Sequence, residues 1–86
     1  MPVSEPIREI RRLGMAGRIG AIVMAEQAVD TCVAAFGKPD DRGIVLDILL
    51  RDLARLRTRE PALDGFIGEV EGYIDLLHRD LACRAA

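Results

Sequence analysis

The chain has 86 residues, of which half are hydrophobic and only 3% aromatic, and its formal net charge is −2. These values indicate one domain, residues 1–86, with a thin core that a partner could help to stabilise. They argue against a nucleic-acid-binding protein, which normally needs a basic surface and stacking aromatics. The most apolar run, residues 19–25, is far shorter than the roughly 18 residues that cross a bilayer, so we expect no membrane anchor.

The first expected helix extends from Ser4 to Ala35. Ser4 can cap it, Pro6 fits its first turn, and Gly37 followed by Pro39 should end it. Small and apolar residues recur at intervals of three and four on one side of this segment, which predicts an amphipathic helix with a shallow face. They are Ile7, Ile10, Gly14, Gly17, Ala21, Ala25, Ala28, Cys32 and Ala35.

An alternative for this segment stays open. The stretch "RRLGMAGRIG" carries glycine at positions 14, 17 and 20, and glycine is unfavourable inside a helix. It could form a loop or a kink, which would give two helices before Gly37 and four in total. We favour the continuous helix.

The second expected helix is capped by Asp40 or Asp41 and ends near Thr58, and Glu60 and Pro61 then start the third. Both helices carry an apolar stripe, which in the second helix consists of Val45, Leu46, Leu49, Leu50, Leu53 and Leu56. In the third helix the stripe consists of Leu63, Phe66, Ile67, Val70, Tyr73, Ile74, Leu77 and Leu81. The expected fold is therefore an all-α, antiparallel bundle of three helices in the order long, short, long.

Six arginines should gather at one end of this bundle. One group starts the first helix and the other ends the second, and antiparallel packing brings these ends together. The residues are Arg8, Arg11, Arg12, Arg55, Arg57 and Arg59. Guanidinium groups bind carboxylates and phosphates, so this end is a candidate site for a small anionic ligand or an acidic protein partner.

Two rows of small residues are candidate interfaces. At 100° per residue, Gly65, Gly68, Gly72 and Leu76 fall opposite the apolar stripe of the third helix, and the first helix offers the row Gly14, Gly17 and Ala21. Small residues three and four apart allow a second backbone to approach closely. We therefore expect a homo-oligomer, or pairing with another helical protein, through at least one row.

Motifs for cofactors, metals and catalysis are weak. The spacing of "GMAGRIG" matches no phosphate-binding loop, and we interpret its glycines as small residues on a packing face. Asp75 and His78 form one Asp-x-x-His pair in a chain with a single histidine, which predicts no metal site. Cys32 is interpreted as a buried apolar residue, and no nucleophile stands beside a base. We expect no cofactor.

Two functional hypotheses follow. The first is a non-enzymatic interaction protein: a self-associating adaptor, regulator or accessory subunit. We expect it to be cytoplasmic, because the sequence begins without a secretory signal and carries two cysteines, Cys32 and Cys83, interpreted as reduced. The second is a small enzyme that binds a carboxylate substrate in an arginine-lined pocket.

The enzyme hypothesis has an architectural parallel. The expected long, short, long helix order is similar to that of the small all-α chorismate mutases. This resemblance implies electrostatic positioning of a substrate by arginines, without a nucleophile. It covers no motif, because the arginine, lysine and glutamate pattern of those enzymes does not fit Arg11, Arg18, Lys38 and Arg51.

Overall fold

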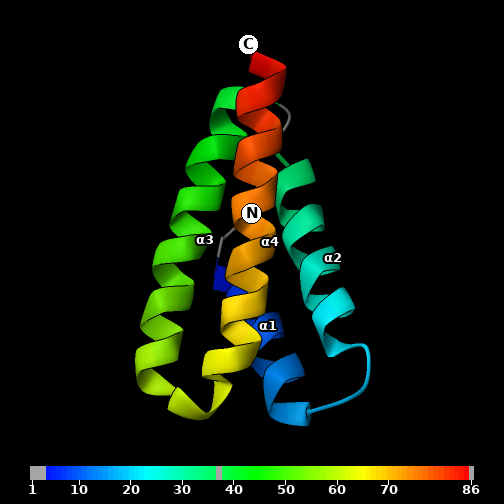
Figure 1. The fold of residues 1–86 in the computed structure, drawn as a ribbon, viewed down its shortest axis with the longest axis vertical. Helices are drawn as coiled ribbons and strands as arrows, with labels where there is room; N and C mark the ends of the chain where they lie inside the picture. The colour runs from blue at the N-terminus through cyan, green and yellow to red at the C-terminus, as the bar shows by residue number, and fades with distance from the viewer. Residues whose placement is uncertain (1–3, 37, 86) are drawn as a thin grey trace.

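The structure, a computed structural model, describes residues 4–36 and 38–85 and is an all-α, antiparallel bundle (Figure 1). It measures 38 × 23 × 23 Å. The helices are α1 (Ser4–Ala16), α2 (Ala21–Ala34), α3 (Pro39–Arg59) and α4 (Asp64–Ala85), with a 3-10 turn, η1 (Pro61–Leu63), before α4. The predicted fold class is confirmed, in its four-helix form. The side chain of Ser4 and the residue Gly37, predicted as a cap and a stop, lie outside the described residues.

The first expected helix breaks at its glycines. Gly17 has a φ of 61° and its N–H donates to the carbonyl of Leu13, which is the left-handed glycine cap that commonly ends a helix. Gly20, with φ 85° and ψ 1°, fits the third position of a type II turn that the N–H of Ala21 closes onto the carbonyl of Arg18. The continuous helix that we favoured is therefore not observed, because two of the glycines adopt backbone angles that end helices.

Helices α3 and α4 have nearly the predicted bounds. The predicted cap of α3 needs correction: Lys38 occupies the N-cap position without a side-chain cap, Pro39 follows, and Asp40 and Asp41 lie inside the first turn. There the carboxylates still favour the helix, because the first turn carries partial positive charge. At the other end, the N–H of Glu60 donates to the carbonyl of Leu56 and closes the helix.

The core is aliphatic and runs the length of the bundle. Among the described residues no polar or charged residue is buried as a whole. The largest fully buried side chains are Ile10, Val29, Cys32, Leu46, Leu49, Leu53, Leu56, Ile67, Val70 and Ile74. Phe66, Tyr73, Leu77 and Leu81 complete the predicted stripe of α4 as partly buried residues. Within the described parts of the chain, no helix is both long and apolar enough to span a bilayer.

Gly14 has a packing role inside this core. A Cβ atom at this position would lie 3.0 Å from Phe66 Cδ1 and 3.1 Å from Leu63 Cδ2, closer than ordinary van der Waals contact. The missing side chain therefore lets α1 approach η1 and the start of α4. The three glycines of "GMAGRIG" thus have three roles: close packing at Gly14, a helix cap at Gly17 and a turn at Gly20.

Candidate functional site

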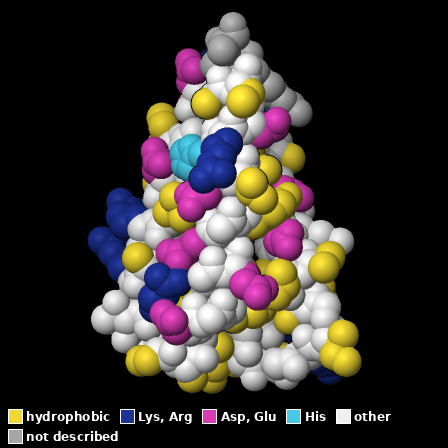
Figure 2. Space-filling view, viewed as in Figure 1, with side chains coloured by type: hydrophobic (Ala, Val, Ile, Leu, Met, Phe, Trp, Pro, Cys, Tyr) yellow, Lys and Arg dark blue, Asp and Glu magenta, His cyan; other side chains and the backbone are white. Residues whose placement is uncertain are grey.

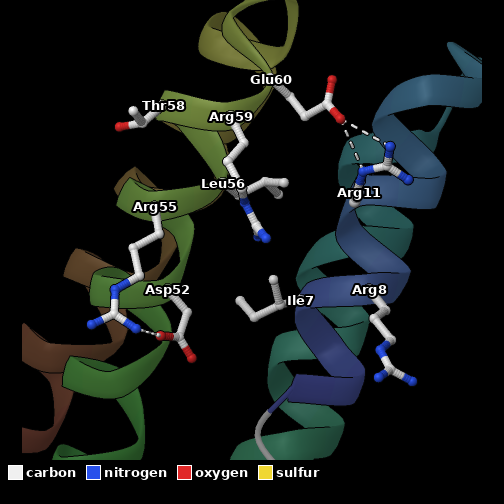
Figure 3. Close-up of a pocket in the computed structure, with 9 residues that line it drawn as sticks. All are labelled: Ile7, Arg8, Arg11, Asp52, Arg55, Leu56, Thr58, Arg59 and Glu60. Carbon is white, nitrogen blue, oxygen red and sulfur yellow. Dashed lines mark hydrogen bonds and ion pairs between the residues drawn. The ribbon is translucent and has the colours of Figure 1, made fainter.

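An open groove lies between α1 and the C-terminal half of α3, with a volume of about 900 Å³. Figure 3 shows its lining side chains, which come from both helices and from the connection after α3. They are Ile7, Arg8, Arg11, Asp52, Arg55, Leu56, Thr58, Arg59 and Glu60. We refer to this feature as the arginine-lined groove.

The groove combines an apolar floor with charged walls. Ile7 and Leu56 are 8% and 1% exposed, so they belong to the core and present only their edges to the groove. The methylene stems of the arginines extend this apolar surface, as long basic side chains commonly do. Four arginines and two acidic residues line the groove, which leaves it basic in a chain of net charge −2.

The four arginines differ in how they are paired. Arg11 donates through Nε and Nη2 to Glu60 Oε1, at 3.2 and 2.9 Å, and Arg55 lies 4.0 Å from Asp52. Arg8 and Arg59 are exposed and have no ion-pair partner among the residues that the structure describes. In Figure 3 the side chain of Arg59 points into the groove between Ile7 and Leu56, whereas Arg8 points away from its centre.

Two members of the predicted arginine cluster lie outside the groove. Arg12 pairs with Glu9 one turn earlier in α1, and its hydrogen bond lowers the pKa of that exposed glutamate. Arg57 lies on the side of α3 that faces α4. The sequence held a signal for this difference. Residues two apart point to different sides of a helix, so Arg57 could have been predicted to lie away from Arg55 and Arg59.

Arg57 joins α3 to α4. Its Nε atom lies 2.8 Å from Asp64 Oδ1 as an ion pair without hydrogen-bond geometry, and its Nη2 atom donates to Glu71 Oε1. The guanidinium group passes over Gly68, where a Cβ atom would lie 3.3 Å from Nη2. Gly68 therefore has a role within one chain, since it leaves room for this pair of ionic contacts.

Two acidic residues, Asp40 and Asp41, lie at the end of the bundle opposite the arginine-lined groove, in the first turn of α3 (Figure 1). Acidic side chains also accompany the arginines at their own end, as the pairs of Glu9, Glu60 and Asp64 show. Figure 2 likewise shows acidic groups along much of the visible face. The arginine end is therefore basic only locally, in the groove.

The two predicted interface rows differ in how much surface they leave. In the first row, Gly14 packs inside the molecule, Gly17 caps α1 and Ala21 is 6% exposed. In the second row, added Cβ atoms at Gly65 and Gly72 would meet open space, and Leu76 is 59% exposed. The accessible part of the predicted interface is therefore the α4 row Gly65, Gly68, Gly72 and Leu76, and its role as an interface stays a prediction.

Gly72→Ala tests that row. In dilute protein it should raise the melting temperature, because alanine is favoured over glycine in a helix by up to ~1 kcal/mol and the methyl group meets no neighbour. At high concentration it should weaken association if the row packs against a second helix, since the methyl group would then clash. Light scattering checks this, with Gly43→Ala on α3 as control. Equal association of both variants contradicts the interface.

The remaining polar contacts tie the helices together. Tyr73 on α4 donates to Asp30 on α2 at 2.6 Å, and this hydrogen bond raises the pKa of Tyr73 to about 12. His78 on α4 lies 3.0 Å from Asp47 on α3, so its observed contact joins two helices.

Burial raises the pKa of the Cys32 thiol, as expected for a core residue. Residues 4–36 and 38–85 contain no cluster of three metal-binding side chains.

Comparison of the chain with protein-family models, curated proteins and solved structures finds no match. Function is therefore inferred from the geometry of the groove and from the exposed surfaces. The parallel with all-α chorismate mutases began from a long, short, long order of helices. With α1 and α2 separate, the four helices have 13, 14, 21 and 22 residues, so that order is absent.

Proposed function

We propose that the protein is a non-enzymatic, cytoplasmic interaction module whose arginine-lined groove binds an acidic segment of a partner protein. The observation that carries this proposal is the pairing of an apolar floor, Ile7 and Leu56, with exposed guanidinium groups from two helices. An amphipathic helix with acidic residues beside its apolar face matches both properties, because helices commonly bind by laying an apolar face into a groove.

The spread of the arginines supports an extended ligand over a small one. A small carboxylate is bound most tightly when several donors converge on one point. In the groove Arg11 is turned to Glu60 and Arg55 to Asp52, while Arg8 and Arg59 point in different directions (Figure 3). Charges spaced along a groove fit acidic side chains spaced along a peptide, and the exposed pairs with Glu60 and Asp52 cost little to exchange for partner carboxylates.

The test uses a defined probe. A synthetic amphipathic helix with leucine on one face and glutamate on the other is labelled, and its binding is followed by fluorescence anisotropy at several salt concentrations. The double variant Arg8→Glu and Arg59→Glu should weaken binding by at least about tenfold at low salt, with a smaller difference at high salt, because screening weakens exposed ionic contacts. Helicity should be unchanged, since both side chains are exposed.

The matched control changes the net charge equally outside the groove. Arg18→Glu with Arg79→Glu should leave peptide affinity within about twofold, because neither residue lines the groove. Equal weakening by both double variants would show a general charge effect and contradict the proposal. The enzyme alternative is tested with a small dicarboxylate, succinate: competition with the peptide at micromolar concentration would favour a small-ligand site instead.

A further inference from the structure

Ile19 forms the tip of an apolar corner. It occupies the second position of the turn between Arg18 and Ala21. The residue is fully exposed to solvent, with a relative exposure of 105%. Met15 and Val23, at 56% and 57%, are exposed in the last turn of α1 and the first turn of α2. Figure 2 shows hydrophobic side chains at the lower right, where Figure 1 draws the α1–α2 connection. We call Met15, Ile19 and Val23 the apolar corner.

A shallow apolar depression, more open than the arginine-lined groove, lies where α2 ends and α3 begins, and we call it the apolar pocket. Its volume is about 290 Å³, and Ile44, which lines it, is 58% exposed. Its lining consists of Phe36, Asp41, Ile44, Val45 and Ile48. In Figure 1 this junction is at the top of the molecule and the apolar corner is at the bottom, so the two features cannot meet within one chain.

We propose that the occupant of this pocket is a second copy of the chain, which inserts Ile19. The charges beside the two features are complementary: Arg18 precedes Ile19 in the turn and has no partner among the described residues, and Asp41 lines the pocket. Two basic residues, Lys38 and Arg42, are near the pocket but do not line it, and Arg42 Nε donates to the carbonyl of Phe36. One contact would thus cover two exposed apolar features and pair two charges.

The resulting association has a distinctive symmetry. Corner and pocket are different surfaces at opposite ends, so a pair of copies keeps one unused pocket, on the copy that inserts Ile19, and one unused corner, on the copy that receives it. Such a contact adds copies head to tail and does not stop at two. The contact is small, which predicts weak association with a Kd of roughly 0.1–1 mM. It uses neither the arginine-lined groove nor the glycines of α4, so it is independent of the proposed function.

Sedimentation velocity of two variants tests the proposal. Ile19→Asp removes the corner and Ile44→Asp removes the pocket, and both residues are exposed, so folding should be unaffected, as circular dichroism would check. The unmodified chain should form species of increasing size as its concentration approaches 1 mM. Each variant alone should be monomeric. Their equimolar mixture should form dimers and nothing larger, because it contains intact corners on one variant and intact pockets on the other.

Exchange of the charges provides the matching control. Arg18→Asp and Asp41→Arg should each weaken association when alone, and mixing the two should restore it, because every corner then meets a pocket of opposite charge. A chain that remains monomeric at 1 mM overturns the proposal. So does association that persists in Ile19→Asp, which would indicate a different surface, such as the glycine row of α4.

Discussion

Leu53→Ala is expected to lower the melting temperature by at least about 10 °C. Leu53 lies in the C-terminal half of α3 and is 0% exposed. Truncating such a leucine costs about 2.7–5 kcal/mol, and each 1 kcal/mol shifts the melting temperature of a domain of this size by about 4–8 °C. A domain of this length has a total stability of about 4–13 kcal/mol, so one residue carries a large part of it. Thermal denaturation followed by circular dichroism measures the shift.

The matched control is Leu76→Ala, which removes the same atoms from a leucine that is 59% exposed. Its effect on the free energy of unfolding of dilute protein should stay within about 0.5 kcal/mol. Similar losses in both variants would contradict the arrangement of the core along α3 and α4. A near-normal melting temperature for Leu53→Ala would contradict it more directly.

Gly20→Ala should destabilise the protein by about 1–2 kcal/mol, although alanine is the better helix former. Gly20 has a φ of 85°, and residues with a Cβ atom are disfavoured in this left-handed conformation by about that amount. No atom within 4 Å would obstruct the methyl group, so the cost comes from the backbone alone. Urea denaturation gives the free energy of unfolding.

Gly43→Ala serves as the opposite case for the same chemical change. Gly43 lies within α3 without a positive φ, and its added methyl group also meets open space. Alanine should therefore stabilise the helix by up to ~1 kcal/mol. The two variants should move stability in opposite directions, and a stabilising effect of both would mean that residues 18–21 do not form the observed turn.

The sequence alone predicted most of the fold because its apolar residues are strongly periodic. Val45, Leu49 and Leu53 of α3 and Ile67 and Ile74 of α4 are buried as their spacing requires. The break after α1 was predicted only as the alternative. Periodicity could not decide it, because small residues continue at helical spacing through Gly17 and Ala21. The number of glycines was the better signal, since each costs a helix about 1 kcal/mol.

The candidate site was predicted in part. Arg8 and Arg11 do line the same groove as Arg55 and Arg59, but not for the predicted reason, because α1 runs parallel to α3 and not antiparallel to it (Figures 1 and 3). Asp52 and Glu60, which line the same groove and pair with two of these arginines, were not predicted to be part of the site. Those contacts depend on the rotation of α1 against α3 and on where the chain turns after α3. Hydrophobic spacing fixes the buried side of a helix but not which charged neighbours meet across a groove.

The contact between Arg57 and Gly68 makes two positions of the chain interdependent. With arginine at position 57, a methyl group at position 68 must displace a guanidinium group that is held by Asp64 and Glu71. With a shorter residue at position 57, the same methyl group would meet no obstacle from it. The free energies of the two substitutions are therefore not additive. During evolution a larger residue could be accepted at position 68 more readily after the arginine had been lost than before, so the order of the two substitutions matters.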